Sequence, residues 1–171
     1  MIKLILVTLL FYSTNTFAYN RADYGSWIDA DRDCQDTRQE VLIRDSNIYS
    51  MSKNNCVINT GVWIDKYTGQ KITNPQDLDI DHIVPLAEAD KSGASKWSKK
   101  DKVAFANDLD NLIAVSIKSN RAKGDKPPHK WMPSQYRCEY LTKWLAIKKK
   151  YSLKVFQAEN NFIQGKLGLC S

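Results

Sequence analysis

The sequence predicts an α+β fold in which helix predominates, and three observations carry this prediction. Residues 78–84 alternate between apolar and polar side chains, and 112–115 form a short apolar run, so each is expected to be a strand. Residues 139–151 carry apolar side chains at helical spacing, with lysines on the opposite face. No Pro/Gly-rich linker divides the 171 residues, which indicates one domain.

The start of the chain is predicted to be a secretory signal peptide. Residues 1–3 are a basic start, 4–12 are mostly apolar, and 16–18 form a small-residue cleavage site. A membrane anchor is the alternative, but it needs about 20 apolar residues, and the polar residues 13–15 interrupt the run too early. We therefore expect cleavage after residue 18, a single domain over 19–171, secretion or periplasmic export, and no stable membrane association.

The cysteines agree with export. The sequence has four cysteines, Cys34, Cys56, Cys138 and Cys170. An even number of cysteines in an oxidising compartment indicates disulfides, here two. Of the three possible pairings we favour Cys34–Cys56 with Cys138–Cys170, because each pair joins a terminal segment to its nearer neighbour. A zinc site is disfavoured, since the sequence has no Cys-x-x-Cys pair and no histidine near a cysteine.

The remaining elements follow from caps and turn residues. A helix is expected over 31–45, capped by Asp31 or Asp33, and one or two strands over 57–67, ended by a Thr-Gly turn. Pro85 ends the first central strand and begins a short helix over 86–91.

Serine and glycine delimit the helices that follow. Gly93 breaks the short helix, and Ser98 caps the next one. After the second central strand, Ser116 caps a helix over 117–123 that Gly124 closes.

Four polar residues on this frame suggest hydrolytic chemistry. Asp81 and His82 lie in the first central strand, and Asn111 precedes the second. Asn120 lies nine residues after Asn111, on the helix that follows the second strand. A neutral histidine suits a general base, and carboxylate and amide oxygens suit Mg²⁺, Mn²⁺ or Ca²⁺. Neighbours in a flat strand point to opposite faces, so Asp81 and His82 can flank one site only at a twisted or bulged strand end. Each residue also has an ordinary structural explanation as a hydrogen-bonded, capping, turn or surface residue.

Three sequence blocks resemble the secreted HNH endonuclease family of the ββα-metal nuclease superfamily. They are Asp-His-Ile-Val-Pro-Leu at 81–86, Phe-Ala-Asn-Asp-x-x-Asn-Leu-x-Ala-Val at 105–115, and Asn-Arg-x-Lys-Gly-Asp-Lys at 120–126. The similarity extends from the Arg-Asp-Cys stretch at Cys34 to the last cysteine. The blocks in this order are specific, whereas any one of them alone is weak.

The resemblance implies a two-stranded hairpin with a helix across it, embedded here in additional helices and holding one divalent ion, most naturally Mg²⁺. It implies His82 as general base, Asp81 and Asn120 as metal ligands, and Asn111 as the member of the catalytic set that holds the inter-strand loop. The implied reaction cleaves DNA, with RNA as a further candidate, and leaves a 5′-phosphate and a 3′-hydroxyl.

Basic residues are candidates for substrate contact. The formal net charge of +6 and pI near 9.1 are typical of proteins that bind polyanions, but many secreted proteins share them. Arg121 and Lys123 flank the expected ligand Asn120 and could contact phosphate, as could Arg44. All three could equally be ordinary surface charges, and Asp45 beside Arg44 offers an ion pair.

The sequence therefore predicts a secreted, monomeric endonuclease with little sequence specificity. One alternative is a secreted nucleic-acid-binding protein whose HNH frame no longer cuts, and another is an antibacterial nuclease toxin. The intact Asp81, His82 and Asn120 favour an active enzyme. An inhibitor protein would protect an exporting cell, but the sequence identifies none.

Overall fold

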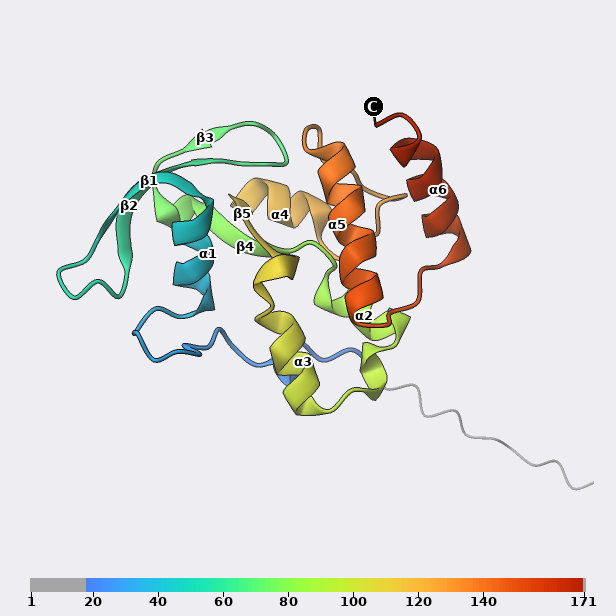
Figure 1. Ribbon diagram of the computed structural model, residues 1–171, viewed down its shortest axis with the longest axis horizontal. Helices are drawn as coiled ribbons and strands as arrows, with labels where there is room; N and C mark the ends of the chain where they lie inside the picture. Colours follow the sequence, from blue (N-terminus) through green and yellow to red (C-terminus); the bar gives the residue numbers. More distant parts are fainter. Residues whose placement is uncertain (1–17, 171) are drawn as a thin grey trace, which may run out of the picture.

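The computed structural model describes residues 18–170, and the expected signal peptide falls almost wholly outside this range. Along the described chain one helix is followed by four strands, two helices, a fifth strand and three helices (Figure 1), which confirms the α+β class. The helices are α1 Thr37–Asp45, α2 Leu86–Ser92, α3 Lys99–Ala106, α4 Ile117–Lys123, α5 Arg137–Lys150 and α6 Gln157–Leu167. The strands are β1 Ser46–Met51, β2 Ile58–Ile64, β3 Lys71–Ile72, β4 Leu78–His82 and β5 Leu112–Ser116.

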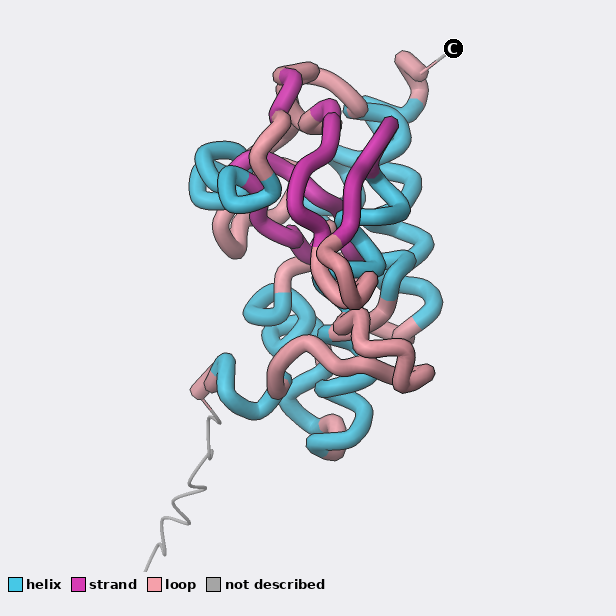
Figure 2. The backbone as a smooth tube through the Cα atoms, turned by 90° about the vertical axis from the view of Figure 1, so that its left-hand side faces the viewer, coloured by secondary structure: helices cyan, strands magenta, loops and turns pink. Residues whose placement is uncertain are grey.

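The strands form two antiparallel sheets. One has the order β1-β2-β3, and the other is the hairpin-like pair β4-β5. Figure 2 shows the strands gathered in the upper half of the molecule, with helices beside and below them. The expected pairing of the two central strands, followed directly by α4, is thus confirmed.

The β4-β5 pair is buried on both faces. Alternate residues of the two strands pack with α1 and β2 on one face: Leu78, Ile80, Leu112 and Ala114 against Val41, Leu42 and Trp63. The other face packs on the helical half of the molecule: Ile113 and Val115 with Tyr140, Leu141 and Trp144 of α5. Because side chains alternate along a strand, the two apolar sets fix the register, and with it the placement of each polar residue.

The caps expected around the central strands are confirmed. The hydroxyl of Ser98 accepts a hydrogen bond from the backbone N–H of Asp101 at the start of α3, and Ser116 accepts one from Ser119 at the start of α4. Gly93 and Gly124 end α2 and α4 with positive φ angles of 140° and 56°, a conformation that glycine adopts at little cost.

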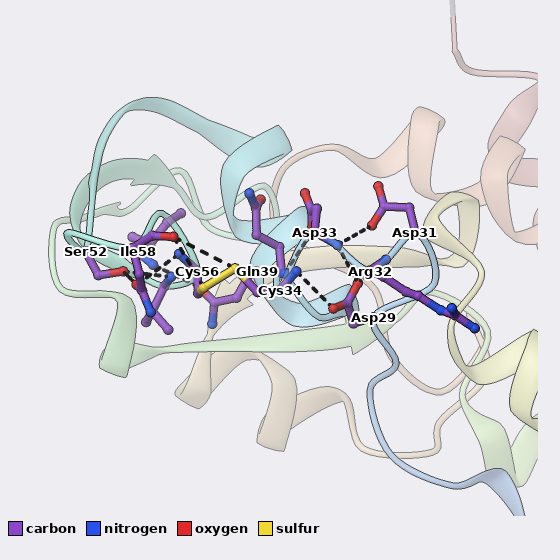
Figure 3. The surroundings of a disulfide bond; sticks show 12 residues. Asp29, Asp31, Arg32, Asp33, Cys34, Gln39, Ser52, Cys56 and Ile58 are labelled. Carbon is purple, nitrogen blue, oxygen red and sulfur yellow. Dashed lines mark hydrogen bonds between the residues drawn. A yellow bond between two sulfur atoms is a disulfide. The ribbon is translucent and has the colours of Figure 1, made fainter.

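The expected start of the first helix was wrong. α1 begins at Thr37 and its N-cap is Asp36, whose carboxylate accepts from the N–H of Gln39, and not Asp31 or Asp33. Residues 29–34 form a tight loop (Figure 3), in which Asp29 accepts from the backbone N–H groups of Arg32 and Cys34. Both of those residues have positive φ, which excludes them from a helix.

Among the helices and strands named above, β1, β3 and α6 were not anticipated. Strand β1 mixes polar and apolar side chains and is largely exposed, so its pairing with β2, and not its own pattern, makes it a strand. Helix α6 follows a short loop after α5 and packs on it. The disulfides Cys34–Cys56 and Cys138–Cys170 form as favoured, and the second joins α5 to the end of α6.

The lysine-bearing face of α5 is only partly exposed. Lys148 is fully buried, and its ammonium lies 2.8 Å from Glu88 Oε1 and 2.9 Å from Glu159 Oε1. Lys148 therefore departs from the expectation that the lysines of this helix lie on the face opposite the apolar one. The pairing with two buried glutamates offsets the cost of removing the ammonium from water and connects α5 to α2 and α6.

Candidate active site

Asp81 and His82 are the last two residues of β4, and they point to opposite faces of the strand pair. His82 lies opposite Leu112 on the face covered by α1, whereas Asp81 lies opposite Ile113 on the other face. Because the strand ends here, both side chains reach one open cleft. The cleft is also lined by Tyr19, Arg21, Asn120 and Arg121.

The imidazole of His82 has a defined tautomer. Its Nε2 lies 2.8 Å from the carbonyl oxygen of Ala106. A carbonyl oxygen only accepts hydrogen bonds, so Nε2 carries the proton and Nδ1 carries the free lone pair. The ring also stacks on Trp27, with centroids 5.6 Å apart and planes inclined by 19°. The arrangement leaves Nδ1 as the atom able to accept a proton.

The surroundings of His82 keep it neutral. Burial lowers the pKa of His82 to about 3, the Ala106 hydrogen bond opposes this shift, and the positive charges of Lys123 and Arg21 add to it. A histidine with so low a pKa is neutral throughout the physiological range, which is the state required of a proton acceptor.

Asp81 is held from two sides. Its Oδ2 accepts a hydrogen bond of 2.6 Å from the hydroxyl of Tyr67, and its Oδ1 accepts one of 2.9 Å from the ammonium of Lys123. Burial raises the pKa of Asp81, while the ammonium and the hydroxyl oppose that shift. The carboxylate is thereby fixed at the cleft, with a second lone pair on each oxygen.

Lys123 is buried and does not line the cleft, so the structure does not support the expected phosphate contact. Its side chain is fully buried and runs from α4 into the fold, where the ammonium also donates to the carbonyl of His82 at 2.7 Å. Burial lowers the pKa of Lys123, and Asp81 opposes the shift. Lys123 thus connects the helix to both cleft residues of β4.

Asn120 projects from α4 into the same cleft. Its Nδ2 donates to Oδ2 of Asp79 at 3.0 Å, and since this contact uses the nitrogen, the carbonyl oxygen of Asn120 is left for another partner. A carboxylate and an amide oxygen lining one cleft are donors that suit Mg²⁺ or a similar hard cation.

Asn111 is fully buried between the strands. Its Oδ1 accepts from the N–H of Val84 at 2.8 Å, and its Nδ2 donates to the carbonyl of the same residue at 3.2 Å. Its backbone carbonyl accepts from Ile83. The side chain therefore extends the hydrogen bonding of the strand pair by one residue and connects the long inter-strand loop to the end of β4.

Arg44 forms the ion pair with Asp45 that the sequence offered as the alternative to a phosphate contact, and it does not line this cleft. Its guanidinium pairs with Asp45 at 2.7 Å and donates to the carbonyls of Leu109 and Leu112 at 2.7 Å each. These bonds hold the start of β5, on either side of Asn111. Arg121 is exposed, as Arg44 is, but unlike Arg44 it lines the cleft.

Several residues of the site carried no sequence signal. Arg21 and Trp27 come from the N-terminal segment, and Tyr67 and Asp65 come from the turn after β2. The fully buried carboxylate of Asp65 accepts from the hydroxyls of Ser116 and Ser119 and so seats the start of α4. The contacts of these residues are tertiary, and no local spacing could have revealed them.

Comparison with known proteins fits this geometry. The family model for the C-terminal domain of GmrSD restriction endonucleases matches residues 34–165, which include both central strands and α4. The chain belongs to this family. Family membership confirms the expected nuclease resemblance and makes nucleic acid the substrate class and a divalent metal the cofactor class.

A relative supports the expected export. A protein of Arthroderma benhamiae described as an uncharacterized secreted protein is 39% identical over 156 residues, which cover 89% of this chain and 76% of its own. No solved structure matches the chain. Within residues 18–170, none of the helices is both long enough and apolar enough to cross a bilayer.

Proposed function

We propose that the protein is a secreted, metal-dependent HNH-type endonuclease that hydrolyses phosphodiester bonds of DNA, and also of RNA, with little sequence specificity. The observation that carries the proposal is the hydrogen bond between Nε2 of His82 and Ala106, which leaves Nδ1 as the proton acceptor of a residue that lines one cleft with Asp81 and Asn120. The working unit is a monomer of residues 19–171.

His82 is the general base. Its neutral Nδ1 accepts a proton from water, the water oxygen forms a bond to phosphorus, and the bond from phosphorus to the 3′-oxygen breaks. The leaving oxygen takes up a proton from solvent, so the products are a 5′-phosphate and a 3′-hydroxyl. The Ala106 carbonyl stabilises the imidazolium that forms, because its bond to Nε2–H strengthens as the ring becomes positive.

Asp81 and Asn120 are the residues that would hold the divalent ion. When bound, this ion supplies positive charge that stabilises the phosphate oxygens and the leaving group. Mg²⁺ is the most suitable ion, and Mn²⁺ or Ca²⁺ has the same preference for oxygen ligands. Lys123 and Tyr67 keep the Asp81 carboxylate oriented, and Asp79 does the same for the Asn120 amide.

Arg121 and Arg21 are the proposed phosphate contacts. Both are exposed, and they line the cleft from two different elements, α4 and the short helix Arg21–Tyr24. The acidic Asp125 at the same cleft is paired with Lys91 at 2.9 Å, so its charge is largely offset. Contacts of this kind recognise the backbone and not the bases, which accounts for low sequence specificity.

A plasmid assay tests the proposal. Oxidised mature protein is incubated with supercoiled DNA in Mg²⁺, Mn²⁺ or Ca²⁺, with and without EDTA. We expect nicked and linear products that EDTA abolishes. If the DNA stays intact with all three metals but shifts in a gel, the protein binds nucleic acid without cutting it, and cleavage that persists in EDTA would contradict the metal assignment.

A further inference from the structure

The N-terminal segment crosses the face of His82. Residues between the short helix Arg21–Tyr24 and α1 run past α3 (Figure 1), and in this stretch the indole of Trp27 stacks on the imidazole. Trp27 is partly buried and packs against the apolar cluster under α1. It lies before the region that the family model matches.

The side-chain amide of Asn107 binds the backbone on both sides of Trp27, next to a second contact between Thr37 and Ile28. Asn107 Oδ1 accepts from the N–H of Ile28 at 3.1 Å, and its Nδ2 donates to the carbonyl of Ser26 at 3.2 Å, so the amide brackets Trp27 on both sides. The same amide accepts from the Thr37 hydroxyl at 2.8 Å and donates to the Val103 carbonyl at 2.9 Å, which anchors it to α1 and α3.

The neighbouring residue contacts His82 directly. Ala106 is the last residue of α3 and supplies the carbonyl that binds Nε2, and Asn107 is the C-cap of the same helix. Two consecutive residues therefore hold the imidazole, one at its edge through a hydrogen bond and the other at its face through Trp27.

We propose that Trp27 and Asn107 are positioning residues for His82, which keep its Nδ1 aimed into the cleft. This inference rests on the proposed nuclease function. The Ala106 hydrogen bond alone leaves the ring able to swing about that contact, and the stacked indole removes this freedom. A displacement of about 1 Å at a catalytic group lowers rates by roughly 10²-fold.

A base-stacking role for Trp27 is the competing explanation, and it makes a different prediction. An indole that stacks on nucleotides contributes to affinity, so its loss weakens DNA binding. An indole that acts through His82 contributes to kcat and leaves KM and DNA affinity unchanged. The partly buried ring, with one face on the imidazole, favours the second role.

The test uses Trp27→Ala, Trp27→Phe and Asn107→Ala in the full mature protein. Trp97→Ala is the matched control, because Trp97 also packs near α3, on Phe105 and Tyr151, and not on His82. We measure kcat and KM for plasmid cleavage, DNA affinity in EDTA by fluorescence anisotropy, and the thermal midpoint of each variant.

We expect Trp27→Ala and Asn107→Ala to lower kcat about 10- to 100-fold with unchanged KM and affinity. Trp27→Phe keeps a ring that stacks and should recover most of kcat, and Trp97→Ala should retain wild-type kcat below its thermal midpoint. In a His82→Ala background, Trp27→Ala should lower the residual rate no further, because the two residues act as one unit.

Three results would overturn the inference while wild type still cuts. They are a wild-type kcat in Trp27→Ala, a loss confined to KM and affinity, and an undiminished effect of Trp27→Ala in the His82→Ala background. Should Asn107→Ala fail to fold, the comparison of kcat between Trp27→Phe and Trp27→Ala still tests the positioning role. If wild type does not cut at all, the proposed function itself fails.

Discussion

The tautomer, orientation and charge of His82 depend on its tertiary contacts more than on its place in the strand. The Ala106 carbonyl selects its tautomer, Trp27 covers one face, and burial suppresses its protonation. Any histidine at the end of a strand could have been purely structural. The combination of a fixed Nε2–H and an Nδ1 in the same cleft as two oxygen donors separates it from that ordinary case.

The first residue-scale prediction concerns the titration of His82. Because its pKa lies near 3, below the ordinary 6.5, the ring stays neutral as pH falls through the usual range of histidine. The ¹H–¹³C NMR signal of the His82 ring, assigned with His129→Ala and recorded in EDTA, should remain constant from pH 8 to about pH 5. A midpoint near 6.5 would contradict the proposed environment.

The second residue-scale prediction concerns the exposed arginines of the cleft. Removing one phosphate contact reduces the slope of log affinity against log salt by about 1. Arg21→Gln and Arg121→Gln should each show this reduction and a higher KM, with the thermal midpoint retained. Arg32→Gln is the control, an exposed arginine that does not line the cleft. Wild-type salt slopes in both variants would remove these residues from the substrate path.

At the scale of elements, α4 connects the two halves of the site. Asp65 and Ser116 seat its start, Asn120 faces the cleft from its middle, and Lys123 reaches from its last turn to Asp81. The helix is therefore positioned by a capping network at one end and by a buried ion pair at the other.

This arrangement predicts a large effect of Lys123→Met. The substitution keeps most of the side-chain volume but leaves Asp81 buried without its partner, and breaking a buried pair costs about 3–5 kcal/mol. We expect that loss in the free energy of unfolding measured with urea, together with lost cleavage. Lys118→Met, exposed on the same helix, should be neutral. Equal stability of the two variants would rule out the structural role of Lys123.

The C-terminal disulfide acts on an element that does not contribute to the site. Replacing Cys138 and Cys170 together by serine should lower the free energy of unfolding by about 2–4 kcal/mol, because α6 is no longer tied to α5. Cleavage at a temperature where the variant is folded should be unchanged. A loss of kcat without a loss of stability would show that α6 influences the cleft.

Elements with local signals were predictable from the sequence, and those that depend on partners were not. Ser98 and Ser116 predicted the starts of α3 and α4 correctly, because capping is a local interaction. The strand β1 has no such signal, since it depends on β2. The start of α1 was misplaced because the Asp29 loop uses left-handed residues that the sequence pattern does not reveal.

The site shows the same division. Asp81, His82, Asn111 and Asn120 were singled out because they lie in sequence blocks that resemble the HNH endonuclease family, and the structure brings them to one end of the strand pair. The burial of Lys123 was missed because the sequence gives the charge of a side chain and not its burial, and the bonds of Arg44 to the carbonyls of Leu109 and Leu112 were missed because they are tertiary.

At the scale of the whole molecule, metal binding should stabilise the fold. A ligand that binds only the folded state adds about 2.7 kcal/mol at a concentration 100 times its dissociation constant. Mg²⁺ should therefore raise the thermal midpoint of wild type, and Asn120→Ala should show a smaller rise with little change in EDTA. Identical rises in the two proteins would exclude Asn120 as a ligand.

The net charge of +6 gives the molecule a general attraction to nucleic acid, but the proposed chemistry depends on one imidazole. The most direct measurement is the single-turnover rate of DNA cleavage in Mg²⁺ by wild type and His82→Ala, with DNA affinity measured in EDTA. We predict a rate about 10²–10⁴-fold lower for His82→Ala with unchanged affinity. Cleavage by His82→Ala at the wild-type rate would contradict the assignment of His82 as the base.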